Sequence, residues 1–243
     1  MKHSIILFTI LIFGSLTSNA QLKIGITGGI DYSKTSIHRL YQDDFGIQGI
    51  AAYHFGFASE YKVNENVYFT ADLLFDKKGF TQPISQETYG NDFLKHNVSD
   101  INVSVNYIEI PILSEFKVKF KKMNVLFGIG PYIAYGIGGK INLDIESGSA
   151  SINFSDKIYW SKFDWMRSAT LNESIVYNLG QSKIQRFDYG PVVRFGIEYN
   201  SFVVSAEYQY GLANLMYEWS KYESMHNQGL GLSVKYLFSL KKL

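Results

Sequence analysis

The sequence has 243 residues, with 23 Lys and Arg side chains against 22 Asp and Glu, and it contains no cysteine. This length suits one barrel domain or at most two small domains. The near-neutral balance leaves no basic surface for nucleic acid, and the lack of cysteine excludes thiol catalysis and thiolate-bound metal. Tyrosine and phenylalanine occur 18 times each and glycine 21 times, a composition that favours strands over helices.

The N-terminal segment predicts export. Lys2 is followed by an apolar run, Ser4–Leu16, and then by Ser18–Ala20, which has small residues at the −3 and −1 positions of a cleavage site. The run is too short to span a membrane, so we expect residues 1–20 to be a signal peptide and residues 21–243 to be the barrel domain. Gln21 follows the cleavage site instead of cysteine, which excludes a lipoprotein anchor. Charged and polar residues interrupt every later apolar run, which excludes a helical membrane protein.

Period-two alternation of apolar and polar residues predicts strands along the rest of the chain. A tilted strand crosses a bilayer with about 9–11 residues, and eight segments are long enough. They are Leu22–Tyr32, Ile50–Val63, Val67–Gly79, Tyr107–Phe120, Asn124–Ile145, Phe187–Tyr199, Phe202–Leu212 and Gln228–Phe238.

The connections between these strands alternate in length. The long ones are Ser33–Gly49, Phe80–Asn106, Glu146–Arg186 and Ala213–Asn227, and the short ones are Asn64–Asn66, Lys121–Met123 and Asn200–Ser201. An outer-membrane barrel has long loops outside and tight turns in the periplasm. We therefore predict an all-β fold: an eight-stranded antiparallel up-and-down transmembrane β-barrel with long extracellular loops and short periplasmic turns, located in the outer membrane of a Gram-negative bacterium.

The volume of the side chains predicts which face meets lipid. One face carries bulky apolar residues, including Phe55, Phe57, Phe69, Phe75, Ile108, Ile110, Ile112, Phe116, Val193, Phe195, Leu230 and Leu232. These side chains are too large for the interior of an eight-stranded barrel. The opposite face alternates glycine with long charged side chains, which fill a narrow polar interior. Aromatic residues beside the short turns predict a periplasmic girdle: Tyr61, Phe120, Tyr199, Phe202 and Phe238.

Two features disturb the regular pattern. Pro111, Pro131 and Pro191 each remove a ladder donor, yet the alternation continues on both sides of each. Apolar residues also change from odd positions over 101–105 to even positions over 108–112. This change of phase predicts a β-bulge near Tyr107.

Several stretches resemble the PorT-like outer-membrane β-barrel family, also called porin family. They are Tyr107–Leu113, Gly128–Gly136, Gly196–Tyr199, Glu207–Leu212 and Gly229–Phe238. The resemblance implies an integral barrel in contact with outer-membrane lipid and lipopolysaccharide. It also implies periplasmic chaperones and the outer-membrane assembly machinery as partners during biogenesis. Related barrels often end at the aromatic residue of the last strand, whereas here five residues follow Phe238.

Charged residues on the interior face are the first candidate site. They are Glu109, Glu115, Lys117, Arg194, Glu198, Glu207 and Lys235. A structural network is one interpretation, because buried charges must be paired. An ion path through a gated channel is the other.

The long connection Glu146–Arg186 carries a second candidate, a recognition patch of Trp160, Phe163, Trp165 and Arg167. Exposed aromatic side chains beside charge are typical of surfaces that bind protein, glycan or lipopolysaccharide. The same side chains could instead pack against each other or rest on the membrane interface.

Catalytic and metal chemistry has weaker support. We expect His38, His96 and His226 in external loops and His54 in the lumen, with no spacing typical of a metal site, so no cofactor is expected. A Ser-His-acid hydrolase site needs a strand histidine beside an outward serine, and we expect His54 to point inward, which argues against an enzyme. Two functions remain open: a structural or interaction barrel that is plugged by side chains and displays its loops, and a narrow porin-like channel for ions or small solutes.

Overall fold

The computed structural model describes residues 22–38, 46–88, 95–147, 150–158, 185–215 and 224–239. Their regular structure is nine strands: β1 (Leu22–His38), β2 (Gln48–Lys62), β3 (Val67–Thr88), β4 (Lys95–Phe120), β5 (Met123–Ser147), β6 (Ala150–Lys157), β7 (Phe187–Tyr199), β8 (Phe202–Tyr210) and β9 (Ser224–Ser239). The described ranges hold no helix that is long and apolar enough to cross a membrane. The expected signal peptide lies outside the described residues.

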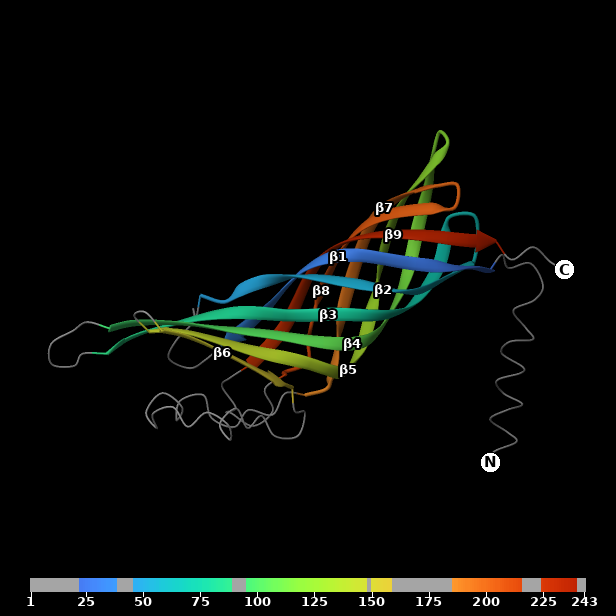
Figure 1. Ribbon diagram of the computed structural model, residues 1–243. Coiled ribbons are helices and arrows are strands. Elements are labelled where there is room, and N and C mark those ends of the chain that lie inside the picture. The colour runs from blue at the N-terminus through green and yellow to red at the C-terminus, as the bar shows by residue number, and fades with distance from the viewer. Residues whose placement is uncertain are drawn as a thin grey trace, which may run out of the picture.

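Eight of these strands close into a ring (Figure 1). Hydrogen-bonded neighbours follow the order β4-β3-β2-β1-β9-β8-β7-β5, and β4 pairs with β5 to close the ring. All pairings are antiparallel. The predicted barrel is therefore confirmed. A closed ring leaves no strand edge facing hydrocarbon, where an unpaired backbone group would have no water to bind.

The outward face of the ring is apolar, as the volume argument predicts. Ile30 and Phe57 are each 68% exposed, and Phe195 is 59% exposed. Phe55 and Phe75 stack on this outer surface with their ring centroids 5.2 Å apart. So large an apolar surface is stable only against acyl chains.

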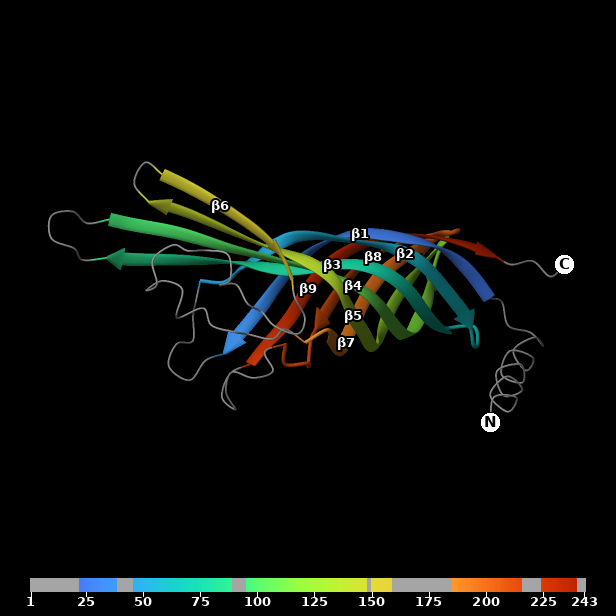
Figure 2. The same ribbon diagram turned by 60° about the horizontal axis from the view of Figure 1, so that its bottom comes forward.

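The strands continue well past the ring on the extracellular side, where the sequence predicts loops (Figures 1 and 2). β3 and β4 pair as far as Thr88 and Lys95, inside the predicted loop 80–106. β6 pairs with β5 inside the predicted loop 146–186. We call residues 80–88, 95–106, 138–147 and 150–157 the extracellular extension. His38, His96 and His226, which we expect in loops, lie in β1, β4 and β9.

The register irregularity near Tyr107 is present, but its cause differs from the predicted one. Asn106 pairs with Gly138 and Tyr107 pairs with Gly136, so the additional residue is Ile137 of β5. β4 itself alternates without a slip, and its odd-numbered residues are buried from 101 through 117. What changes along β4 is the chemistry of each face. The inward residues are apolar in the extension, whereas in the barrel they include the charged residues Glu109, Glu115 and Lys117.

The prolines lie within paired strands. Pro131 and Pro191 face each other across β5 and β7, on the outer surface of the barrel. Pro111 pairs with Tyr132 and is fully buried. Each ladder continues beyond its proline, in agreement with the alternation of the sequence.

Candidate functional site: the charged interior

Four charged side chains form a closed ring at the periplasmic end of the lumen. We call it the basal ring: Lys23 of β1, Glu60 of β2, Lys117 of β4 and Glu198 of β7. The Lys23 ammonium lies 2.9 Å from both carboxylates. The Lys117 ammonium lies 2.8 Å from Glu198 and also contacts Glu60. Asn124 donates a further hydrogen bond of 3.2 Å to Glu198. Each charge has two opposite neighbours, so the basal ring is neutral.

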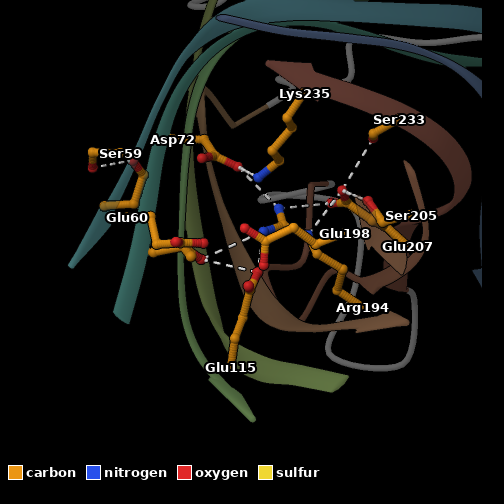
Figure 3. A network of polar contacts seen from close by, with 12 residues as sticks. Ser59, Glu60, Asp72, Glu115, Arg194, Glu198, Ser205, Glu207, Ser233 and Lys235 are labelled. Carbon is orange, nitrogen blue, oxygen red and sulfur yellow. Dashed lines mark hydrogen bonds and ion pairs between the residues drawn. The ribbon is translucent and has the colours of Figure 1, made fainter. Parts of the chain in front are cut away.

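The central cluster gathers four charged side chains around the guanidinium of Arg194 (Figure 3). Arg194 is 1% exposed. Its Nη2 lies 2.9 Å from Asp72, its Nη1 lies 2.7 Å from Glu115, and its Nε lies 2.9 Å from Glu207. Lys235 also contacts Asp72. Arginine suits this position because its planar fork serves several carboxylates at once. The carboxylates come from β3, β4 and β8, so one side chain ties separate walls of the barrel together.

The upper cluster surrounds Lys78 on the extracellular side of the central cluster. The Lys78 ammonium lies 2.6 Å from Glu109 and 3.4 Å from Asp76. It donates to the side-chain oxygen of Gln209 at 3.0 Å, and Gln209 donates to Glu109 at 2.6 Å. The ammonium also lies 4.4 Å from the centre of the Tyr132 ring, within range of a cation–π contact. All of these charges are desolvated, and removing one partner would leave the others uncompensated.

An apolar layer closes the lumen above the upper cluster. We call it the apolar cap, and its members include Phe80, Ile101, Val103, Val105, Ile141, Ile158, Leu215 and Met225. Most of these side chains belong to the extracellular extension. The interior is therefore filled by charge pairs over its lower part and by hydrocarbon at its outer mouth.

The cavities that the described residues enclose between these layers are small. The cavity beside His54, Asp76 and Lys78 has a volume of about 20 Å³, and the cavity beside Glu60 and Asp72 has about 10 Å³. One water molecule needs roughly 10–15 Å³. The larger cavity therefore holds about one water, and the smaller one is at the limit.

His54 lies in an arrangement that superficially matches a catalytic triad. Its Nδ1 lies 2.7 Å from Asp31, and its Nε2 lies 2.9 Å from the Ser233 hydroxyl. The Ser233 hydroxyl donates its hydrogen to Glu207 at 3.0 Å, so it accepts from His54. Both ring nitrogens then act as donors, which is the imidazolium form. A nucleophilic serine must instead give its proton to the histidine, and the adjacent cavity leaves no room for a substrate.

Glycines provide the space for these side chains, as expected for a crowded polar interior. A Cβ added at Gly29 would lie 2.5 Å from the His54 ring and 2.3 Å from the Leu232 carbonyl oxygen. A Cβ added at Gly231 would lie 2.1 Å from the Asp31 carboxylate. The His54–Asp31 pair therefore requires glycine on the neighbouring strands.

The structure brings the seven candidate interior residues into the lumen, where Glu198 and Lys117 join the basal ring, Glu109 joins the upper cluster and the others join the central cluster. Sequence analysis did not single out Asp31, Asp76, Lys78 or Gln209. The alternation along β3 could have identified Asp76 and Lys78, because both lie on the same even-numbered, inward face of the strand as Asp72. The candidate patch of Trp160, Phe163, Trp165 and Arg167 lies outside the described residues. No group of three or more metal-binding side chains occurs within the described ranges.

A closed ring with an apolar outer belt, a charged lumen and tight turns at one end defines an integral outer-membrane β-barrel. The chain belongs to the family described as outer membrane protein beta-barrel domain, whose model matches residues 17–217. This membership agrees with the predicted location in the outer membrane of a Gram-negative bacterium. The narrower resemblance to PorT-like barrels stays a prediction.

Solved structures of outer-membrane proteins resemble this chain at low identity. The attachment invasion locus protein Ail of Yersinia pestis is 13% identical, with 90% of this chain and 99% of that chain covered and a TM-score of 0.38. Neisserial surface protein A is 11% identical, with 91% and 100% covered and a TM-score of 0.39. OprG of Pseudomonas aeruginosa is 10% identical, with 90% and 95% covered and a TM-score of 0.38. A search of curated protein sequences finds no match.

Proposed function

We propose that this protein is a closed scaffold that displays its extracellular segments to a partner and conducts no solute. The observation that carries the proposal is the filled lumen. The basal ring, the central cluster and the upper cluster follow one another along the axis, and the apolar cap covers them. The cavities beside these clusters, of about 20 and 10 Å³, are too small for a hydrated ion.

The charge pairs support a sealing role over a conducting one. A conducting path needs binding sites that an ion can enter and leave. Here each carboxylate of the basal ring contacts two ammonium groups, and Arg194 contacts three carboxylates. An ion passing through would have to break several desolvated pairs at once.

Planar-bilayer conductance tests the proposal. The purified full chain should insert without stable openings across a wide range of voltage. A double variant, Arg194→Ala with Glu207→Ala, removes two large side chains of opposite charge and should introduce small openings. Openings in this double variant would show that the barrel inserts into the bilayer under these conditions, so that the silence of the unaltered chain reports a closed lumen. Stable openings of the unaltered chain that are lost when Glu198 or Arg194 is changed would instead establish a narrow channel.

The recognition part of the proposal rests on the aromatic and charged side chains of the third extracellular connection. We propose Trp160, Phe163, Trp165 and Arg167 as contacts for an extracellular protein or a glycan. Replacing residues 159–184 with a short Gly-Ser linker keeps β6 and should leave membrane insertion intact, whereas binding to protein or glycan arrays should be lost. Trp219→Ala, in a different connection, is the control and should retain binding. Equal binding by the replaced and unaltered chains would contradict this assignment.

A further inference from the structure

The periplasmic mouth of the barrel has an open hollow next to the tip of the β4–β5 hairpin. The hollow has a volume of about 460 Å³ and is lined by Lys119, Lys121, Lys122, Asn124, Glu198, Tyr199 and Asn200. The hairpin tip projects at the upper right of Figure 1. The hollow is far larger than either cavity in the lumen, and it opens away from the extracellular segments.

The charge of this hollow is positive. Three ammonium groups line it, and Glu198 is its single carboxylate. Glu198 already contacts Lys23 and Lys117 in the basal ring, so it does not offset the three lysines. The hollow therefore has an excess of about three positive charges, which attract an anion.

The backbone of the hairpin tip gives a second, independent observation. Lys121 has a φ of 55°, in the left-handed region that lysine adopts less readily than glycine or asparagine. The β7–β8 turn has the same length and shape, and there the corresponding residue is Asn200, with a φ of 54°. The β4–β5 turn thus carries a cation where an uncharged residue would suit the backbone better. We take this as a sign that the charge itself is used.

The depth of the hollow indicates the source of the anion. Phe120 and Tyr199 are 57% and 50% exposed and belong to the periplasmic girdle, which marks the level of the lipid headgroups. The Lys121 ammonium lies 5.7 Å from the centre of the Phe120 ring, so it is held beside this girdle. The lysines are therefore at the depth of the phosphates of the periplasmic leaflet.

We propose that this hollow binds the phosphate group of an anionic phospholipid of the periplasmic leaflet. Lysine binds phosphate as a point charge, and several lysines around one hollow suit a headgroup that carries a net negative charge. The proposal is independent of the closed lumen, because the basal ring separates the hollow from the interior.

Native mass spectrometry of the detergent-purified full chain tests the site, with phosphatidylglycerol, phosphatidylcholine and inorganic phosphate as probes. Phosphatidylglycerol should bind more tightly than phosphatidylcholine. Each lysine removed should weaken its binding roughly fivefold, the usual contribution of one basic residue at a membrane surface. Lys121→Asn is the main variant, since Asn200 shows that this turn accepts asparagine. Lys62→Asn removes a charge from the same end of the barrel, outside the hollow, and should leave the affinity unchanged.

Two results would overturn the proposal. Equal loss of phosphatidylglycerol binding in Lys121→Asn and Lys62→Asn would show general surface charge and no site. Binding of inorganic phosphate as tight as that of phosphatidylglycerol, with the same sensitivity to Lys121→Asn, would show a free anion as the ligand. A gel-mobility assay of the folded barrel confirms that both variants are folded before binding is compared.

Discussion

β4 passes through two regions that have opposite chemistry although the strand never changes its geometry. In the extracellular extension its inward residues are Ile101, Val103 and Val105, and polar residues such as Ser104 face out. In the barrel the inward residues include Glu109, Glu115 and Lys117, and the outward ones are Ile108, Ile112 and Phe116. The inversion occurs at Asn106 and Tyr107, where the register with β5 is also irregular.

The difference shows that the solvent decides which face is apolar. Above the inversion water lies outside, so apolar side chains turn inward to form a packed core. Below it acyl chains lie outside, and polar side chains take the interior. The inversion along β4 therefore marks the outer boundary of the membrane on this protein.

The largest expected effect comes from breaking the charged interior. Arg194→Leu would leave Asp72, Glu115 and Glu207 without their shared cation, and the loss of one partner of a buried ion network costs about 3–5 kcal/mol. Urea unfolding in lipid vesicles should show this decrease in the free energy of unfolding. Arg194→Lys is the matched control, because it keeps the charge and loses only the fork. We expect the decrease in the free energy of unfolding to be clearly smaller in Arg194→Lys than in Arg194→Leu. An equal loss in both variants would mean that packing dominates at this position.

Arginine substitutions on the outward face compare the stability cost on the two sides of the membrane boundary. Val193 lies on the lipid side of β7, paired with Ile129, so Val193→Arg should cost about 2–4 kcal/mol if it lies near the middle of the membrane. Ser104→Arg places the same charge on the outward face of the extension and should change stability by less than about 0.5 kcal/mol. Equilibrium unfolding in vesicles measures both. Equal costs at the two positions would contradict the boundary at Asn106 and Tyr107.

The barrel could be predicted from the sequence because side-chain volume and connection length act together. The bulk of residues such as Phe55 and Phe195 assigns the outer face, and the three short turns assign the periplasmic end. The extension could not be predicted in this way. Ile101, Val103 and Val105 follow the pattern of a sheet whose outer face meets water. The sequence prediction assumes that apolar residues of a strand always face lipid. Under that assumption the inward apolar residues of the extension are interpreted as a change of phase within a loop.

The charged interior could be predicted in part. Alternation along single strands placed Arg194, Glu198 and Glu207 inside. The partners of each charge depend on the register between distant strands, which local patterns do not contain. His54 illustrates the limit: its inward direction was predictable, whereas its bonds to Asp31 and Ser233 require the pairing of β1 with both β2 and β9.

The extension should respond to a change in its own core without affecting the barrel. Ile101 is 2% exposed, and Ile101→Ala should cost about 2 kcal/mol, the low end for such a truncation, because strands outside the membrane can relax around the cavity. Hydrogen exchange followed by mass spectrometry should show faster exchange over residues 95–106 and 140–147 and unchanged protection over residues 108–118. Ser104→Ala, at an outward position of β4 in the same extension, is the control. Faster exchange in both segments would show that extension and barrel unfold as one unit.

The smallest expected effect tests the interpretation of His54 as part of the network. Ser233→Ala removes a hydroxyl that accepts from His54 and donates to Glu207. Hydrogen bonds to charged groups contribute about 1.5–3 kcal/mol, and we expect the low end of this range because His54 keeps Asp31 and Glu207 keeps Arg194 as partners. Vesicle unfolding should show a decrease of this size, and Ser205→Ala, which removes a weaker bond to the same carboxylate at 3.3 Å, should show less. Neither variant should change the hydrolysis of a nitrophenyl ester by the purified barrel. Ester hydrolysis by the unaltered chain that disappears in Ser233→Ala alone would contradict the structural role. The two serines differ in their contact with His54, so only a nucleophilic Ser233 would separate them in this assay.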